Sequence, residues 1–421
     1  MRGIEAALKV LTENQNTIFA SEALRKLADS EKMKAPDISL ASSLIYIFMR
    51  KRELWEKILS DGRFLSSKEK LPLPVNIAII MGVGGILELR RFSVGVLING
   101  IIEYLKQNKF TKYSGVVNAV LRKIIEDGEN IISKYKNSPS IENKALFSGV
   151  PLWTMPAWNK TWNKSELKEI FEMFNIPSYS SVRNSDGSIT RLNETVLPKN
   201  LEGFNEGLVT VQSESSILAA SLVKKFYSGK NMILDMCSGR GVKAGQVLQE
   251  NQNSKIECWE LSEKRSKSAE NELERLKVKD RASFKVGNAL TLESENKFSF
   301  IMLDAPCSCS GTWNRKPESK WRLDWKKFDN LVMTQKKLLE RAINLCENGG
   351  NILYITCSLL KQENEFVVAE ILSKYPDCTE ISSLIDWNDK KVFRRGKPYG
   401  IYILPCNSWL DGFYCSLIMK K

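Results

Sequence analysis

The 421-residue sequence predicts an α/β fold: a mostly parallel, seven-stranded sheet with a C-terminal antiparallel hairpin, preceded by an all-α domain and a small α+β subdomain. Three observations predict it. Residues 1–137 carry apolar side chains at helical spacing, a polar stretch follows them, and from residue 226 onward short apolar runs alternate with amphipathic segments. That alternation is typical of a doubly wound sheet.

The N-terminal domain, residues 1–137, is expected to be a helical bundle with a basic surface. Its predicted core consists of three apolar stripes: Ile4, Ala7, Leu8 and Leu11; Leu44, Ile45, Phe48, Leu54, Trp55, Ile58 and Leu59; and Val116, Val117, Val120 and Leu121. Basic residues lie between the stripes: Arg50, Lys51, Arg52, Arg90, Arg91, Arg122 and Lys123. The net charge of +13 favours a polyanionic partner, although charge alone does not separate a nucleic-acid binder from a basic soluble protein.

A polar linker near residues 134–143 leads to a small mixed subdomain, residues 145–225, in which tryptophans alternate with turn residues. The final domain, residues 226–421, contains the alternating elements. Its predicted strands are 232–236, 255–261, 282–286, 298–303, 351–355, 400–404 and 412–420. Its predicted helices are 242–249, 263–277 and 326–345.

Composition excludes several classes of protein. The chain has no histidine, which rules out Ser-His and Cys-His dyads and zinc sites that contain histidine. Its nine cysteines include no CxxC pair, so we expect neither a disulfide framework nor a bound metal. The longest apolar stretch, residues 75–87, is too short to span a bilayer. We therefore expect a cytoplasmic protein, monomeric and not bound to a membrane.

The first strand of the α/β domain leads into a glycine-containing turn, Asp-Met-Cys-Ser-Gly-Arg-Gly-Val-Lys at residues 235–243. The two glycines allow close approach of a ligand, and the following helix N-terminus supplies backbone donors. Glu260, at the end of the second strand, is suited to accept both hydroxyls of a ribose, and Asn288 follows the third strand, where it could hydrogen-bond an adenine. This set predicts a nucleoside-bearing cofactor without a pyrophosphate.

Two cysteines follow later strands. Asp304-Ala305-Pro306-Cys307 comes after the fourth strand, and Thr356-Cys357-Ser358 comes after the fifth. Because ligands of open α/β sheets bind at the carboxyl edge, both thiols and the Asp304 carboxylate are expected to converge there. The run from Trp313 to Arg322 interleaves basic residues with indoles, which suits phosphates and unstacked bases; a loop anchored by its tryptophans is the alternative.

These motifs, with Glu363-Asn364-Glu365, resemble those of the Nop/Sun family of S-adenosyl-L-methionine-dependent RNA cytosine-5 methyltransferases. The N-terminal helices, including residues 115–122, are similar to a NusB-type RNA-binding domain. The resemblance implies that Cys357 is the nucleophile, Cys307 assists product release, and Asp304 binds the target base. It also implies a cofactor site formed by Cys237, Ser238, Gly239, Arg240, Gly241, Val242, Lys243, Glu260, Asn288 and Asp304.

The chemistry agrees with those roles, because thiolate addition to carbon 6 of cytosine makes carbon 5 nucleophilic enough to take a methyl group. Without histidine, a second thiol or water must complete the elimination, and Lys243 is a candidate to favour the thiolate. The family's Pro-Gly-Gly-Lys is here Arg240-Gly241-Val242-Lys243, and its third-strand acid is Asn288. Small-subunit ribosomal RNA, 16S rRNA, is the expected substrate. Transfer RNA, large-subunit ribosomal RNA and a role as a non-catalytic ribosome-assembly factor are the alternatives, and the role of Cys309 is open.

Overall fold

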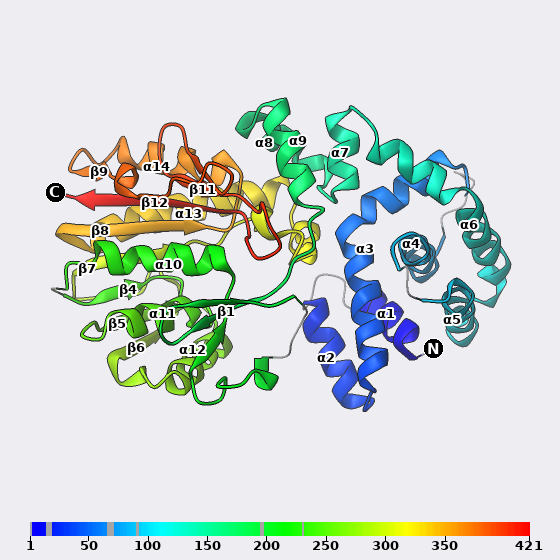
Figure 1. Ribbon diagram of the computed structural model, residues 1–421, viewed down its shortest axis with the longest axis horizontal. Coiled ribbons are helices and arrows are strands. Elements are labelled where there is room, and N and C mark those ends of the chain that lie inside the picture. Colours follow the sequence, from blue (N-terminus) through cyan, green and yellow to red (C-terminus); the bar gives the residue numbers. More distant parts are fainter. Residues whose placement is uncertain (1, 14–18, 65–70, 90–91, 194–197, 230) are drawn as a thin grey trace. The chain divides into compact units, whose positions relative to one another are not determined.

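The computed structural model describes residues 2–13, 19–64, 71–89, 92–193, 198–229 and 231–421 (Figure 1). Its contacts divide the chain into two compact units. The first comprises residues 1–156, 164–175 and 316–322, and the second comprises residues 157–163, 176–315 and 323–421. The division into three domains drawn from the sequence remains a prediction. Across the described residues, no helix combines the length and apolar composition that crossing a membrane requires.

The first unit is helical, as the sequence predicts. Its α-helices are α1 (Arg2–Glu13), α2 (Ala20–Ser30), α3 (Ala35–Asp61), α4 (Leu73–Glu88), α5 (Val94–Gln107), α6 (Ser114–Lys136), α7 (Ile141–Phe147) and α9 (Lys164–Met173). Short 3-10 turns are η1 (Thr111–Tyr113), η2 (Leu152–Thr154) and η6 (Pro317–Arg322). Helix α4 contacts α1, α3, α5 and α6 and is buried along most of its length, because nearly all of its side chains are apolar (Figure 1).

The predicted apolar stripes form the core of this unit, with one exception. Val116 is 41% exposed, since it is one position away from Val117 and the helix turns its side chain outward. Arg90 and Arg91, two of the predicted basic surface residues, lie outside the described residues.

Helix α3 has a kink at Lys51, where the backbone leaves helical geometry (φ −132°, ψ 31°). Near the kink, three backbone carbonyls accept hydrogen bonds from side chains. Ile47 accepts from Trp55 Nε1 at 3.1 Å, Met49 from Trp321 Nε1 at 2.5 Å, and Arg50 from Lys320 Nζ at 2.5 Å. Segment η6 thus packs onto the kinked part of α3.

The second unit holds the large sheet, whose order is β10-β11-β12-β8-β7-β4-β5-β6, with β9 paired to β12 (Figure 1). The strands are β4 (Ile233–Asp235), β5 (Ile256–Glu260), β6 (Ala282–Val286), β7 (Phe298–Asp304), β8 (Cys346–Thr356), β9 (Cys378–Glu380), β10 (Phe393–Arg395), β11 (Ile401–Ile403) and β12 (Phe413–Lys420). Strands β4 to β8 pair in parallel, and β12 pairs antiparallel to β8. The predicted fold class is confirmed.

The prediction of seven strands is wrong, because the large sheet contains nine strands among the described residues. The two missed strands, β9 and β10, have three residues each, which is too short for an alternating pattern to appear. The helices are α10 (Glu214–Phe226), α11 (Val242–Glu250), α12 (Glu263–Arg275), α13 (Trp325–Leu345) and α14 (Glu365–Leu372), with turns η4 (Lys279–Arg281), η5 (Ser310–Thr312), η7 (Lys361–Glu363) and η8 (Ser382–Leu384). Helix α11 packs between α10 and α12, and α13 packs against α14.

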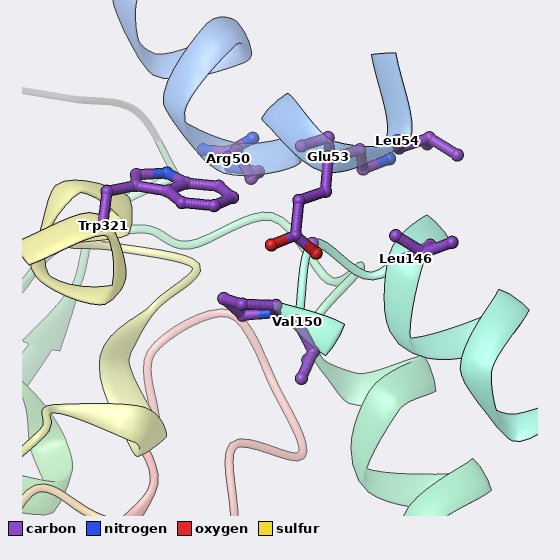
Figure 2. A pocket seen from close by; sticks show the side chains of 9 residues that line it. Arg50, Glu53, Leu54, Leu146, Val150 and Trp321 are labelled. Atoms are coloured by element: carbon purple, nitrogen blue, oxygen red, sulfur yellow. The ribbon is translucent and has the colours of Figure 1, made fainter. Parts of the chain in front are cut away.

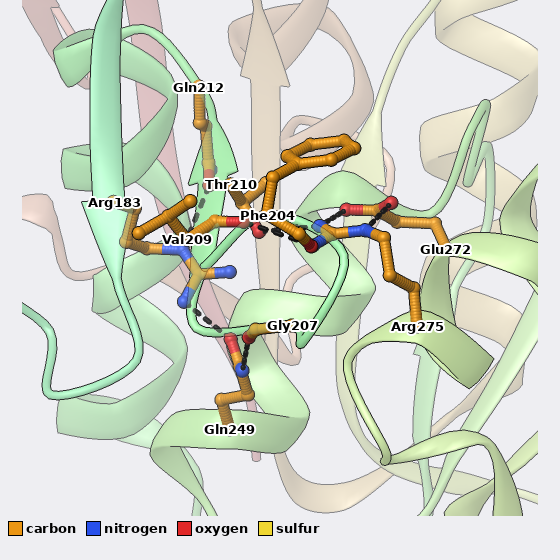
Figure 3. A network of polar contacts seen from close by, with 9 residues as sticks. All are labelled: Arg183, Phe204, Gly207, Val209, Thr210, Gln212, Gln249, Glu272 and Arg275. Atoms are coloured by element: carbon orange, nitrogen blue, oxygen red, sulfur yellow. Dashed lines mark hydrogen bonds and ion pairs between the residues drawn. The ribbon is translucent and has the colours of Figure 1, made fainter. Parts of the chain in front are cut away.

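A small antiparallel sheet of order β2-β1-β3 precedes the large one in the chain. Its strands are β1 (Ser181–Asn184), β2 (Ile189–Arg191) and β3 (Val209–Val211), with α8 (Met155–Thr161) and η3 (Pro198–Asn200) nearby in sequence. Arg183, only 1% exposed, donates to Gln212 Oε1 at 3.0 Å and to Gln249 Oε1 at 2.7 Å (Figure 3). Arg275 of α12 donates to the carbonyl oxygen of Val209 at 3.0 Å. These buried contacts fix the small sheet to α11 and α12.

Candidate active site

The candidate site lies at the carboxyl edge of the parallel strands. Strands β4, β5, β7 and β8 end at Asp235, Glu260, Asp304 and Thr356, and the sheet order makes the loops that follow them neighbours. Three acids therefore gather at one edge of the sheet, as the sequence predicts.

The glycine-containing loop turns sharply between β4 and α11. Gly239 (φ +59°) and Gly241 (φ +75°) have the left-handed backbone that favours glycine. A Cβ on Gly241 would lie 2.9 Å from the Cβ of Ala269, whereas a Cβ on Gly239 would meet nothing within 4 Å. The backbone at Gly239 is thus open to a ligand. The other loop candidates are Ser238, which is buried, Cys237, Val242 and Lys243, which are half-buried, and Arg240, which is exposed.

Glu260 and Asn288 differ in their surroundings. Glu260 is 5% exposed, accepts from the backbone N–H of Gly239 at 2.9 Å and pairs with Arg265 at 2.6 Å. It therefore ties the glycine-containing loop to β5. Asn288 is exposed after β6, and its Oδ1 accepts from the backbone N–H of Leu290 at 3.1 Å.

The ends of β4 and β7 carry two acids, Asp235 and Asp304, and Lys243 pairs with the second. Lys243 Nζ lies 2.5 Å from Asp304 Oδ2. Burial lowers the pKa of Lys243, but Asp304, Asp235 and Cys357 together outweigh it, so the pKa is raised and the ammonium is retained. Asp235 is 1% exposed, and burial, followed by the charge of Asp304, raises its pKa to about 8. Neither Asp235 oxygen accepts a well-formed hydrogen bond, although the nearby N–H of Cys237 acts to lower the pKa.

The two predicted thiols converge. Cys307 and Cys357, on the loops after β7 and β8, have their Sγ atoms 3.3 Å apart. The Sγ atom of Cys309 lies within 4.8 Å of both. Contacts with Cys309 and Cys357, and then burial, hold the pKa of the Cys307 thiol well above its usual range. Cys307 therefore keeps its proton at neutral pH.

Residues 227–419 match a family described as 16S rRNA methyltransferase RsmB/F, and residues 4–126 match the NusB family. The C-terminal domain is thus similar in sequence to the RsmB/F methyltransferases. The Ribosomal RNA small subunit methyltransferase B of Vibrio cholerae is 24% identical over 94% of this chain and 92% of its own length. Its namesake in Klebsiella pneumoniae is 26% identical over 93% of this chain and 92% of its own length. The sequence resemblance is thereby confirmed.

Solved structures show the same fold. The crystal structure of PH0851 has a TM-score of 0.78 at 21% identity and covers 100% of this chain and 98% of its own. A methyltransferase homolog protein from Pyrococcus horikoshii has a TM-score of 0.56 at 21% identity, with coverage of 68% of this chain and 100% of its own. The first of these structures therefore shares the fold of this chain over its full length.

The protein uses S-adenosyl-L-methionine as methyl donor, in agreement with the sequence prediction. The residues present fit this ligand. The space beside the Gly239 backbone allows a ligand to approach closely, and the buried Asp235 carboxyl group has unsatisfied oxygens beside the loop. The Asp304 carboxylate places a negative charge at this edge of the sheet, which suits a sulfonium cation.

Asp235 should make the stability of this domain depend on pH. Its pKa is raised in the folded state, to about 8, so the folded protein holds a proton that the unfolded chain releases near pH 4. The contribution of this proton to the free energy of unfolding is therefore fully present at low pH and is lost as the pH rises from about 4 to 8. We expect the Tm of Asp235→Asn to fall less between pH 5 and pH 8 than the Tm of wild type. The difference should be ~2–4 °C for each kcal/mol of unfolding free energy that wild type loses and the variant keeps. Equal pH slopes in calorimetry, without added cofactor, would contradict this assignment.

The candidate site also contains a buried acid to which the sequence assigned no role. Glu363 is fully buried and accepts from the backbone N–H of Ser308 at 2.7 Å, from Ser358 Oγ at 2.6 Å and from Gln335 Nε2 at 3.0 Å. It thereby joins the loops that carry Cys307 and Cys357. The only sequence signal was its place in the family-like triplet Glu363-Asn364-Glu365, which reveals no partner.

We expect Glu363→Gln to reduce kcat by about 10²-fold, because loss of one charged acceptor lets the two thiol loops shift relative to each other. KM for RNA should change little, since Glu363 is buried. Glu365→Gln is the matched control: Glu365 is also buried but bonds Tyr402 instead of the thiol loops. Steady-state kinetics would contradict the positioning role if both variants lost activity equally.

Part of the basic aromatic run is buried, whereas its Lys316 is exposed. Trp313 is 2% exposed and donates to the carbonyl of Ser308 at 3.0 Å, and Lys320 is 1% exposed. Trp321 and Lys320 are bonded to α3, and burial holds the pKa of Lys320 well below its usual range. Trp321 lines a shallow pocket with Arg50, Lys51, Glu53, Leu54, Leu146, Gly149, Val150 and Pro151 (Figure 2). Trp313, Lys320 and Trp321 therefore anchor the run, as the alternative expected, and its contact with RNA stays a prediction.

Proposed function

We propose that this methyltransferase modifies carbon 5 of a cytosine in small-subunit ribosomal RNA through a covalent adduct with Cys357. One observation carries the proposal: two thiols from separate strand ends lie 3.3 Å apart in a domain whose sequence matches the RsmB/F methyltransferases. Binding alone requires neither thiol. The names of the bacterial relatives and the NusB match at residues 4–126 support a ribosomal RNA substrate.

In the proposed reaction, the Cys357 thiolate adds to carbon 6 of the cytosine, and a carbon–sulfur bond forms. The electron pair moves toward carbon 5, which becomes nucleophilic. Asp304 hydrogen-bonds the base, and the ammonium of Lys243 beside it stabilises negative charge at this edge, including that of the Cys357 thiolate. S-adenosyl-L-methionine supplies the methyl group to carbon 5.

Release requires loss of the carbon 5 proton and cleavage of the carbon–sulfur bond. Cys307 holds its proton and lies within contact distance of the Cys357 sulfur. We assign it as a hydrogen-bond donor to the departing sulfur, which receives the electron pair of the broken bond, while water takes the carbon 5 proton. The target base must leave its stack to reach the thiols, which favours a loop or single strand.

A comparison of three unmodified RNAs tests the proposal. The protein is incubated with S-adenosyl-L-methionine carrying a labelled methyl group and with 16S rRNA, large-subunit rRNA or transfer RNA, and the product is analysed for 5-methylcytosine. We expect label in 16S rRNA. Label only in another RNA would overturn the substrate, and a different methylated position would overturn the chemistry. Silence on all three, with cofactor bound, would support a non-catalytic assembly factor.

A further inference from the structure

We propose that Cys307, Cys309 and Cys357 form a binding site for a soft, thiophilic cation, with Zn²⁺ as the probe, and that its occupation blocks methyl transfer. The inhibition rests on the proposed function, whereas the binding does not. All three Sγ atoms lie within 4.8 Å of one another, and two of them are 3.3 Å apart. Around a tetrahedral zinc ion with Zn–S bonds of about 2.3 Å, neighbouring sulfurs are about 3.8 Å apart. The Cys307–Cys357 separation is about 0.5 Å below that value and the other two are at most 4.8 Å, so only small shifts are needed.

Cys309 has no part in the proposed methyl transfer, which uses two thiols. Its backbone is left-handed (φ +59°), a conformation uncommon outside glycine and asparagine. The sharp turn directs its Sγ toward the carbonyl oxygen of Cys307, at 3.7 Å. Strained backbone of this kind is found mostly at functional sites, and here it holds the third sulfur beside the other two.

The donor set selects the class of ion. Three thiols without carboxylate or imidazole favour Zn²⁺ or Cu⁺ over Mg²⁺ or Ca²⁺. Each thiol that binds gives up one proton, and solvent can occupy the fourth position. All three cysteines are half-buried, so the ion can exchange. Because binding engages the sulfur lone pairs, Cys357 cannot attack the base while the ion is held. The absence of CxxC pairs did not reveal this site, because the Cys357 sulfur comes from another strand end.

The test uses full-length protein, freed of metal with a chelator and kept reduced with a phosphine. Zn²⁺ binding is measured by competition with a chromophoric chelator, and Co²⁺ is added separately to detect thiolate-to-metal absorption. We expect one ion per chain for wild type and for Cys406→Ser, a half-buried cysteine outside the cluster. Cys309→Ser and Cys309→Ala should bind at least about tenfold more weakly, with melting curves confirming that they fold. Wild-type affinity in either folded variant would overturn the proposal.

Methyl transfer to RNA, assayed with added Zn²⁺, forms the second arm. Wild type and Cys406→Ser should lose activity and regain it on chelation, while Cys309→Ser should stay active at the same Zn²⁺ concentration. Equal inhibition of all three would overturn the inhibitory role, as would inhibition reversed by reductant and not by chelator, which indicates a disulfide. If wild type transfers no methyl group to any RNA, the proposed function fails, while the binding titration still decides the site.

Discussion

Cys357→Ala should abolish methyl transfer, with a loss of at least about 10³-fold in rate, or ~4 kcal/mol of transition-state stabilisation. The reason is that carbon 5 of cytosine does not attack a methyl donor until a nucleophile adds to carbon 6. Alanine removes that nucleophile. It leaves Asp304, Lys243 and the glycine-containing loop in place, so binding of S-adenosyl-L-methionine should be retained.

Two measurements on the Cys357→Ala variant together test this prediction. Labelled methyl transfer reports turnover, and a denaturant-resistant protein–RNA band reports the covalent adduct. Cys357→Ala should give neither, whereas the half-buried Cys406→Ala should behave as wild type in both. Activity near the wild-type level in Cys357→Ala would show that another group attacks the base, with Cys307 the first to examine.

The convergence of the site could be predicted because it depends on topology. Once Asp304 and Thr356 are recognised as ends of buried parallel strands, Cys307 and Cys357 must follow at the same edge, and the structure places their sulfurs 3.3 Å apart. The same reasoning placed Asp235 and Glu260. Strand ends are visible in a sequence, because apolar runs stop there and polar residues begin.

Contacts between distant side chains could not be predicted in this way. The pairing of Lys243 with Asp304 joins residues 61 positions apart, and Glu363 joins two loops through hydrogen bonds that no periodicity encodes. Lys320 shows the limit most clearly. A lysine in a polar run is expected at the surface. Lys320 is instead buried, because the carbonyl oxygens of Arg50 and Gly149 accept hydrogen bonds from its Nζ.

Cys307→Ala should separate the two halves of the reaction. Attack by Cys357 and methylation of carbon 5 do not need Cys307 in the proposed mechanism, so the covalent adduct should form. Release should slow by about 10²-fold or more, because the departing sulfur loses the hydrogen bond donated by its neighbour. The variant should therefore accumulate methylated, denaturant-resistant adduct. It should complete one turnover, after which methyl transfer nearly stops.

The protonation state of Cys307 sharpens this prediction. Its contacts with Cys309 and Cys357 hold the pKa of Cys307 well above the usual range, so it remains a donor throughout neutral pH. The rate of release in wild type should then show no increase between pH 6 and 8 from titration of the Cys307 thiol. If Cys307 instead acted as a thiolate base, release would rise about tenfold per pH unit, because the reactive fraction grows tenfold per unit below the pKa. The decay of preformed adduct in a single turnover measures how the release rate depends on pH. If the release rate rose steeply with pH in wild type but not in Cys307→Ala, Cys307 would act as a base and not as a hydrogen-bond donor.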